Sequence, residues 1–340
     1  MTDPASPPDP RAALRTEWIR ATLRDPTAEA VRASMDAGFR SYWRVATADG
    51  SRIVMDSPPD LEDVRPWLKV HALLDGGGVR VPRVLAEDAS QGFLLLEDLG
   101  TETYLHAIHP GNADAFFEDA TTQLLRLQAI APPADMPAYD EALLARELRL
   151  FDEWFCGRHL GMALDCGDLE TLDAAYRLLV DSALAQPQVL VHRDFMPRNL
   201  MPANDGPAVL DFQDAVRGPI AYDALSLFKD AFLSWPEDRV GAWLARYHQR
   251  ARDAGLPVPA LDRFLRDADL IGVQRHLKVI GIFARLHHRD GKPKYLADVP
   301  RFFAYLDAVL PRHPGLHDLQ RFIAHKVKPA MARLAAVADA

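Results

Sequence analysis

A short polar stretch in the second half of the chain carries the residue types that chemistry needs. It begins with His192, Arg193 and Asp194 and, after four further residues, reaches Asn199. Another carboxylate, Asp211, directly follows a short apolar run. A carboxylate can accept the proton of a hydroxyl, and carboxylate and amide oxygens are the ligands that Mg²⁺ prefers. The set predicts phosphoryl transfer, with Asp194 as catalytic base and Asn199 and Asp211 as magnesium ligands.

The spacing matches the catalytic-loop pattern of protein kinases, H-R-D followed by four residues and Asn. An Asp after a strand is usually a turn or helix-cap residue. Here the Asp–Asn spacing coincides with a preceding strand and with a second strand that ends at Asp211, which favours the kinase interpretation. We expect His192 to brace the loop backbone. The segment that reads D-F-G in protein kinases is Asp211-Phe212-Gln213 in this chain, so its glycine is absent.

The first hundred residues predict a small lobe built on a sheet. Two apolar runs flank Asp49-Gly50, a residue pair typical of a hairpin turn. The predicted elements are a helix at 11–24, a hairpin within 39–56, a helix at 60–75, and strands at 84–86 and 93–96.

Helices dominate from about residue 112, with apolar residues stepping by three and four. Two very short strands, at 189–191 and 209–210, carry the polar residues, and a long helix is expected at 258–289. The predicted fold class is α+β: a bilobal protein-kinase-like fold with a small β-sheet N-lobe and a larger helical C-lobe. The expected divisions are a disordered tail at 1–10, a nucleotide-binding lobe at 11–100 and a catalytic and substrate-binding lobe at 101–340.

Composition and charge argue against nucleic-acid-binding, membrane-spanning and secreted proteins. The net charge of −9 argues against a nucleic-acid partner, and no apolar run is long enough to span a membrane. Cys156 and Cys166 have no metal-site spacing, and the N-terminus has no signal-peptide pattern, so we expect a cytoplasmic protein. His287 and His288 are adjacent and should point in different directions on a helix, which argues against a metal site there.

The segments VLVHRDFMPRNL and AVLDFQDAVRGPIAYDALSL resemble the aminoglycoside phosphotransferase / choline kinase superfamily. Within it, the match is closest to the bacterial cell-wall recycling sugar kinases, which phosphorylate the anomeric (C1) hydroxyl of N-acetylmuramate and N-acetylglucosamine. Three further segments carry the same resemblance, which spans about residues 30–300: DAGFR at 36–40, VMDSPP at 54–59 and LLLEDLG at 94–100.

The resemblance implies ATP and Mg²⁺ as cofactors and a small amino sugar as the partner. It implies that residues 95–99 link the lobes and that backbone groups near Glu97 and Leu99 meet the adenine. It also implies that Asp223 supports the catalytic loop.

One departure concerns the lysine that kinases place on the third strand to hold the phosphates. Here Met55 or Asp56 occupies that position, and no lysine precedes Lys69. Arg44 or Arg40 on the neighbouring strand could make the phosphate contact instead. The alternative is that both are solvated edge-strand arginines.

The segment 275–294 holds six basic residues and one acid. A basic wall suits an acceptor with a carboxylate, such as N-acetylmuramate, better than a polycationic aminoglycoside or choline. The alternative is a solvated helix face. Arg275 and Arg198 are the predicted sugar contacts.

Two other functions stay open on the sequence. The acceptor could be an aminoglycoside, choline or another amino alcohol. The chain could also be a nucleotide-binding pseudokinase with a regulatory role, as the missing strand lysine suggests. The intact set of Asp194, Asn199 and Asp211 argues against a pseudokinase.

Overall fold

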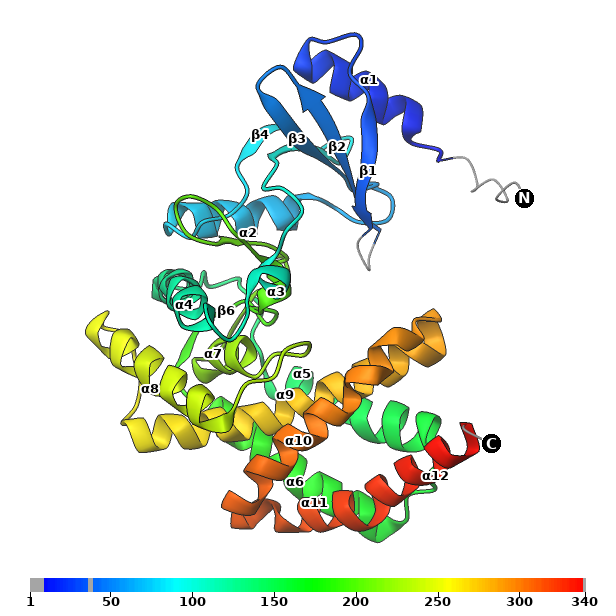
Figure 1. Ribbon diagram of the computed structural model, residues 1–340, viewed down its shortest axis with the longest axis vertical. Coiled ribbons are helices and arrows are strands. Elements are labelled where there is room, and N and C mark those ends of the chain that lie inside the picture. The colour runs from blue at the N-terminus through cyan, green and yellow to red at the C-terminus, as the bar shows by residue number, and fades with distance from the viewer. Residues whose placement is uncertain (1–8, 36–38, 339–340) are drawn as a thin grey trace. The chain divides into compact units, whose positions relative to one another are not determined.

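The computed structural model describes residues 9–35 and 39–338. The chain forms two compact units (Figure 1). The first comprises Met1–Glu102 and Met201–Gln213, and the second comprises Thr103–Leu200 and Asp214–Ala340. Residues 1–8 of the predicted tail and residues 36–38 of the family-like segment DAGFR lie outside the described residues.

The first unit contains a five-stranded antiparallel sheet with strand order β1-β2-β3-β5-β4. Its strands are β1 (Ala30–Met35), β2 (Ser41–Thr47), β3 (Gly50–Asp56), β4 (Val84–Asp88) and β5 (Phe93–Glu97). The predicted hairpin is β2–β3, in which Thr47 lies opposite Gly50, and Gly50 adopts φ +117°. This positive φ explains the glycine. β1 was not predicted.

Helix α1 (Ala12–Leu23) covers one face of this sheet (Figure 1). Ile19 is buried in a cluster with Val45, Val54 and Leu95, one residue from each of three adjacent strands. Strand alternation explains why these residues share the buried face. Val54 on β3 lies opposite Trp43 on β2 and Leu95 on β5, and directly opposed residues point to the same face of a sheet. The predicted helix at 11–24 is therefore confirmed in position, and the structure shows that it buries Ile19 and Arg15.

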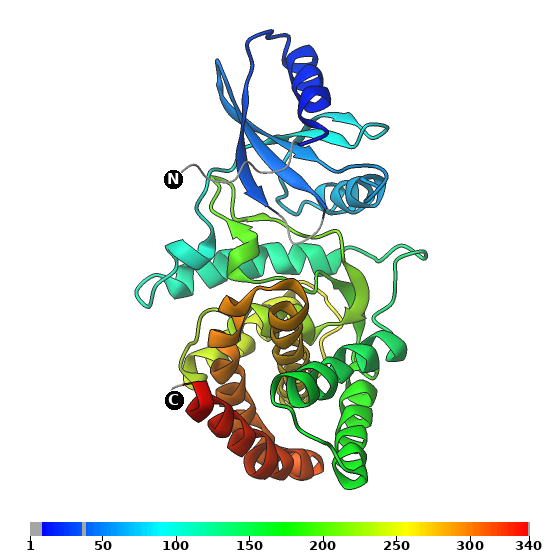
Figure 2. The same ribbon diagram turned by 90° about the vertical axis from the view of Figure 1, so that its right-hand side faces the viewer.

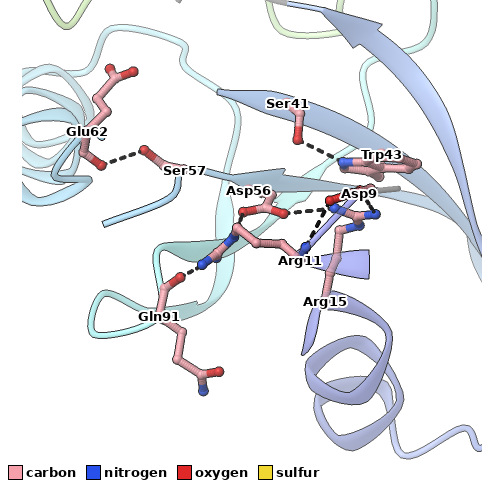
Figure 3. Close-up of polar contacts among 9 residues, drawn as sticks. All are labelled: Asp9, Arg11, Arg15, Ser41, Trp43, Asp56, Ser57, Glu62 and Gln91. Carbon is pink, nitrogen blue, oxygen red and sulfur yellow. Dashed lines mark hydrogen bonds and ion pairs between the residues drawn. The ribbon is translucent and has the colours of Figure 1, made fainter. Parts of the chain in front are cut away.

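The last residue of β3, Asp56, anchors α1 to the sheet (Figure 3). Its carboxylate is 2% exposed and pairs with Arg11 at 2.7 Å and with Arg15 at 2.8 Å. The Arg15 guanidinium also lies 3.6 Å from the ring centroid of Trp43. A buried carboxylate is tolerated when its charge is met by such partners.

Helix α2 (Arg65–Gly76) and the segment 201–213 complete the first unit. Phe212 packs against Trp67 of α2 with ring centroids 5.0 Å apart. The Val209 amide donates to the Arg80 carbonyl oxygen at 2.7 Å. The short strands β7 (Leu200–Met201) and β8 (Ala208–Val209) pair with each other here. A segment distant in sequence is thereby held on α2.

The second unit is mainly helical and contains one two-stranded antiparallel sheet, formed by β6 (Gln188–Val191) and β9 (Val216–Pro219). Its α-helices are α3 (Tyr104–Ala107), α4 (Ala113–Ala129), α5 (Glu141–Leu150), α6 (Cys166–Leu184), α7 (Ala221–Phe228), α8 (Glu237–Asp253), α9 (Leu261–Asp290), α10 (Val299–Val309), α11 (His317–Phe322) and α12 (Lys328–Ala338). The π-helical segments are η1 (Phe151–His159) and η6 (Ile323–Val327), and the 3₁₀ turns are η2 (Pro197–Asn199), η3 (Pro293–Asp298), η4 (Leu310–Arg312) and η5 (Pro314–Leu316). The described residues include no helix that is both long and apolar enough for a membrane span.

Helix α9, yellow to orange in Figures 1 and 2, is the central element of this unit and packs against α5, η1, α6, α7 and α10. Two glycines allow the close approach. A Cβ on Gly272 would lie 2.7 Å from Leu225 Cδ2, and one on Gly281 would lie 2.2 Å from the backbone carbon of Leu150. Leu150 is the residue at which α5 ends and the π-helical η1 begins.

We predict that Gly281→Ala destabilises the protein by about 1–3 kcal/mol or more, because the new methyl group meets backbone that cannot rotate away. Gly241→Ala is the matched control. It changes an exposed position within α8 that has no atom within 4 Å of the added Cβ, and should raise stability by about 0.5–1 kcal/mol. Urea unfolding of both variants tests this, and a neutral Gly281→Ala would refute the close crossing.

Candidate active site

The catalytic loop follows β6 and is held from behind by Asp223 on α7. The Asp223 carboxylate is fully buried and accepts the backbone N–H groups of His192 at 2.7 Å and Arg193 at 3.0 Å. Burial raises the pKa of Asp223 to about 6, and the neighbouring His192 and the two amides partly offset that rise. The role expected of Asp223, support of the loop, is confirmed by these hydrogen bonds.

His192 is fully buried, and its Nδ1 accepts the backbone N–H of Asp194 at 3.2 Å. The histidine thus braces the loop, as its position in the motif predicted. Arg193 has φ +75°, a left-handed conformation that is uncommon outside glycine. Such strain persists only where the surroundings enforce it, and the two hydrogen bonds to Asp223 do so here.

Asp194 and Asn199 are brought together at the two ends of the loop. The Asn199 Nδ2 donates to the backbone carbonyl of Asp194 at 2.9 Å. This bond orients the amide, because Oδ1 then faces away from that carbonyl. The Asp194 side chain is half-buried, whereas Asn199 is 9% exposed. The loop therefore presents one accessible carboxylate beside one oriented amide oxygen.

A buried charge cluster lies behind the loop, and sequence reasoning missed it. Glu147 of α5 accepts from Arg193 at 2.6 Å and from Lys278 of α9 at 3.0 Å, and the Tyr139 hydroxyl also donates to it. Lys278 in turn donates to the Tyr222 hydroxyl at 3.2 Å. Glu147 lies in an amphipathic helical stretch, and the sequence of such a stretch does not distinguish a buried acid from a solvent-exposed one.

The charges of this cluster stabilise one another. Burial alone would raise the pKa of Glu147, but the Lys278 and Arg193 charges outweigh it and leave that pKa lowered. Burial would also lower the pKa of Lys278, yet Tyr222 and Glu147 outweigh it and leave that pKa raised. Asp194 is among the charges that raise the Lys278 pKa. The cluster is therefore ionised and tied electrostatically to the loop.

Asp211 belongs to the first unit, where it follows β8. It is exposed, adopts φ +63°, and its Oδ1 accepts a hydrogen bond from Gln213 at 2.8 Å. The next residue, Phe212, is buried against α2. The ring anchors the turn, and the left-handed backbone presents the carboxylate to solvent.

The residues predicted for the nucleotide also lie in the first unit. Arg44 binds Asp98 through two bonds of 2.5 and 3.0 Å, and its Nη2 also donates to the Gly100 carbonyl at 2.9 Å. Burial would raise the pKa of Asp98, but the hydrogen bonds from Arg44 and Ser51 lower it to about 2. Arg44 therefore holds the segment after β5, and its contact with a phosphate stays a prediction.

Glu97 and Leu99 flank Asp98 in the segment expected to meet the adenine. The Glu97 N–H is used, since it donates to the Arg83 carbonyl at 2.9 Å, and its side chain pairs with Arg80 at 2.7 Å. The Leu99 N–H has no hydrogen-bond partner within the described part of the chain. Leu99 thus offers a backbone donor to a ligand, whereas the Glu97 N–H is already used.

Strand alternation separates the two residues that could stand where the missing lysine would be. Asp56 faces α1 and is paired with Arg11 and Arg15. Met55 lies on the opposite face of the sheet and is fully buried. Which of these two residues corresponds to the lysine stays a prediction. Arg40, the other candidate replacement, is 7% exposed with its Nε 3.4 Å from Glu62.

The basic segment 275–294 is not a uniform wall. The predicted sugar contact Arg275 is wrong, because this side chain is 1% exposed and donates inward to the Lys229 carbonyl at 3.3 Å. Arg289 pairs with Asp290 at 2.7 Å. Arg198 is exposed and lies 5.2 Å from the Phe232 ring centroid, and its sugar contact stays a prediction.

Arg285 differs from these neighbours. It is half-buried, and its Nε has no hydrogen-bond partner among the described residues. Burial, followed by the nearby charge of Arg289, lowers its pKa, and Asp290 and Glu147 oppose that lowering. A partly desolvated guanidinium whose Nε has no partner in the described part of the chain is a ready site for an anion.

We predict a characteristic pH dependence for Asp223→Asn. The folded-state pKa of Asp223, about 6, lies above its ordinary value of 3.8, so its titration stabilises the fold at low pH and this contribution is lost as pH rises through about 6. Asparagine cannot titrate. The unfolding free energy of the wild type minus that of the variant should therefore increase by about 2 kcal/mol from pH 7 to pH 4.5. Chemical denaturation across that range measures it, and a constant difference would contradict the assignment.

Comparison with known proteins places this site in a family. The model of the phosphotransferase enzyme family (APH) matches residues 29–264. The N-acetylmuramate/N-acetylglucosamine kinase of Pseudomonas aeruginosa is 56% identical over 300 residues, covering 88% of this chain and 89% of that protein. The protein of the same name from Pseudomonas putida is 51% identical over 327 residues, covering 93% and 96%.

Solved structures show the same fold at low sequence identity. The ADP-bound aminoglycoside phosphotransferase APH(2'')-Ib has a TM-score of 0.58 at 16% identity, covering 88% of this chain and 98% of that one. The choline kinase LicA from Streptococcus pneumoniae has a TM-score of 0.60 at 13% identity, covering 87% and 99%. The predicted protein-kinase-like fold is thereby confirmed, and the chain belongs to the phosphotransferase enzyme family.

Proposed function

We propose that this chain transfers the γ-phosphate of ATP to the C1 hydroxyl of N-acetylmuramate and N-acetylglucosamine, with Asp194 as the catalytic base. The observation that carries the proposal is the braced loop, in which Asp194 is accessible while Asn199 and Asp223 fix its backbone. The two Pseudomonas kinases support the choice of acceptor, since they are more than half identical to this chain over most of its length.

The chemistry follows from the position of a carboxylate on a rigid loop. The acceptor oxygen attacks the γ-phosphorus, its proton passes to a carboxylate oxygen of Asp194, and ADP leaves. An anomeric hydroxyl is more acidic than an ordinary alcohol, so the base needs chiefly to orient it and to accept the proton late. The backbone bonds to Asp223 and His192 keep Asp194 in place during this step.

Magnesium fits the residues present. Asn199 presents an oriented amide oxygen and Asp211 an exposed carboxylate, which are the hard oxygen ligands that this ion takes. When bound, Mg²⁺ would neutralise charge on the phosphates. The adenine would meet the Leu99 N–H and the Glu97 carbonyl.

The proposal also assigns separate roles to the N-terminal and C-terminal parts of the chain. We assign nucleotide binding to residues 11–100 and catalysis with sugar binding to 101–340. A cytoplasmic location follows from the use of ATP, and the two acceptor sugars are components of peptidoglycan, so the enzyme would act in cell-wall recycling.

Arg285 is the residue that we assign to the acceptor carboxylate. It replaces Arg275, which is buried, as the cation of the basic segment best suited to an anion. N-acetylmuramate carries a lactyl carboxylate, whereas N-acetylglucosamine does not. A single desolvated guanidinium would therefore distinguish the two acceptors.

For the base, we expect Asp194→Ala to lower kcat by about 100- to 10,000-fold while the affinity for ATP with Mg²⁺ stays within about threefold of wild type. The reason is that Asp194 acts on the acceptor and not on the nucleotide. Asn199→Ala and Asp211→Ala should instead weaken Mg²⁺-dependent nucleotide binding together with the rate. Steady-state kinetics and calorimetry measure the two effects.

The matched control for this series is Asp214→Ala, an exposed aspartate close to Asp211 in sequence that has no side-chain hydrogen bond in the described structure. It should leave rate and affinity unchanged. An equal loss of nucleotide affinity in the Asp194, Asn199 and Asp211 variants would refute the separate roles. Good turnover of kanamycin or choline with both sugars inert would overturn the acceptor assignment.

For the acceptor, we expect Arg285→Ala to lower kcat/KM for N-acetylmuramate about tenfold or more relative to N-acetylglucosamine, the loss of one charge-assisted hydrogen bond of about 1.5–3 kcal/mol. Arg289→Ala is the control, because Arg289 lies one turn further along α9 and is already paired with Asp290. Measuring kcat/KM of both variants on both sugars tests whether Arg285 contacts the acceptor carboxylate. Equal effects on the two sugars would remove Arg285 from the carboxylate site and leave the kinase assignment standing.

A further inference from the structure

Three histidines converge where η1 meets the end of α9. His159 is the last residue of η1, and His287 and His288 lie in the last turn of α9. Each offers one ring nitrogen, and these three atoms lie within 4.8 Å of one another. The adjacency of His287 and His288 argued for diverging side chains, but their ring centroids are 4.5 Å apart and both rings approach His159.

The spacing of one pair of these nitrogens matches a tetrahedral metal ion. His159 Nδ1 and His288 Nε2 are 3.2 Å apart. Two imidazole nitrogens bound to one Zn²⁺ at about 2.0–2.1 Å are separated by about 3.3 Å in tetrahedral geometry. The set contains three imidazoles and no carboxylate, which favours zinc and similar transition metals over magnesium or calcium. A tetrahedral ion would keep one position for water.

A hydrogen bond between His159 and His288 accounts for only part of the arrangement. His287 also carries a buried Nδ1 that has no hydrogen-bond partner among the described residues. A buried polar atom without a partner costs free energy unless something satisfies it. The third ring of the cluster thus carries a buried ring nitrogen without a partner among the described residues.

We propose that His159, His287 and His288 form a binding site for a divalent transition metal ion of the zinc class, which ties the end of η1 to the last turn of α9. Neutral imidazoles are the form that binds metal.

The site differs in its ligand chemistry from the proposed magnesium ligands. His287 follows Lys278, the α9 residue of the charge cluster behind the catalytic loop, by about 14 Å along the helix axis. Its ligands are nitrogens from two helical segments, whereas Asn199 and Asp211 offer oxygens. Its effect is therefore on the stability of the helical unit, and it does not depend on the proposed reaction.

The test uses full-length protein without a histidine tag, stripped with a chelator and titrated with ZnCl₂ in the presence of excess Mg²⁺. Wild type should bind one equivalent, and saturating Zn²⁺ should raise its Tm by about 5 °C. His159→Ala and His288→Gln should weaken binding by about 100-fold or more and abolish the Tm shift. Co²⁺ in place of Zn²⁺ should give the visible absorption of a tetrahedral site in wild type and not in these two variants.

Two controls make the outcome decisive. His325→Ala removes an exposed imidazole from the same unit and should bind Zn²⁺ like wild type, as should Asp211→Ala, which alters only a proposed magnesium ligand. Circular dichroism of the metal-free variants checks that they fold. Undiminished Zn²⁺ affinity in folded His159→Ala and His288→Gln, or a wild type without stoichiometric binding, would overturn the proposal.

Discussion

The buried carboxylate of Asp223 is the element on which the active-site geometry depends. By accepting the amides of His192 and Arg193, it holds a strained backbone in place and lets a half-buried Asp194 face outward. Burying this charge is unfavourable, as the raised pKa of about 6 shows. The two hydrogen bonds from the backbone amides offset the cost of burying this charge. They also link the start of α7 to the loop, and a neutral side chain would accept them less strongly.

A second layer of charge gives the loop its rigidity. Glu147 joins Arg193 of the loop to Lys278 of α9, so α5, the loop and α9 share one buried ion cluster. In such a cluster the loss of one partner leaves the others buried and unpaired, so removal of a single charge destabilises the whole cluster. The same cluster explains why the basic run on α9 divides into internal residues, such as Lys278, and half-buried ones, such as Arg285.

The absence of the strand lysine has consequences throughout the first unit. Of the two residues that could stand in its place, Met55 is an apolar side chain buried in one face of the sheet, and Asp56 lies on the other face and anchors α1 through Arg11 and Arg15. α2 buries Trp67, Val70, His71 and Leu74, and its sequence contains no glutamate that could pair with such a lysine. Arg44 instead pairs with Asp98 after β5. The charged residues of this sheet thus pair with α1 and with the segment after β5.

Local patterns in the sequence were sufficient for the catalytic loop, the β2–β3 hairpin, the helix at the N-terminus and the two-lobed fold class, because turn residues, strand alternation and motif spacing act over a few residues. Strand β1, the placement of 201–213 on α2, the burial of Arg275, the ion cluster around Glu147 and the convergence of His159 with His287 and His288 came only from the tertiary structure. These features depend on which helix face packs inward and on contacts between segments far apart in the chain. A charged residue on an amphipathic helix gives the same sequence pattern whether it lies in solvent, in an ion pair or in the core. Only the packing of the helix against other segments determines which of the three applies.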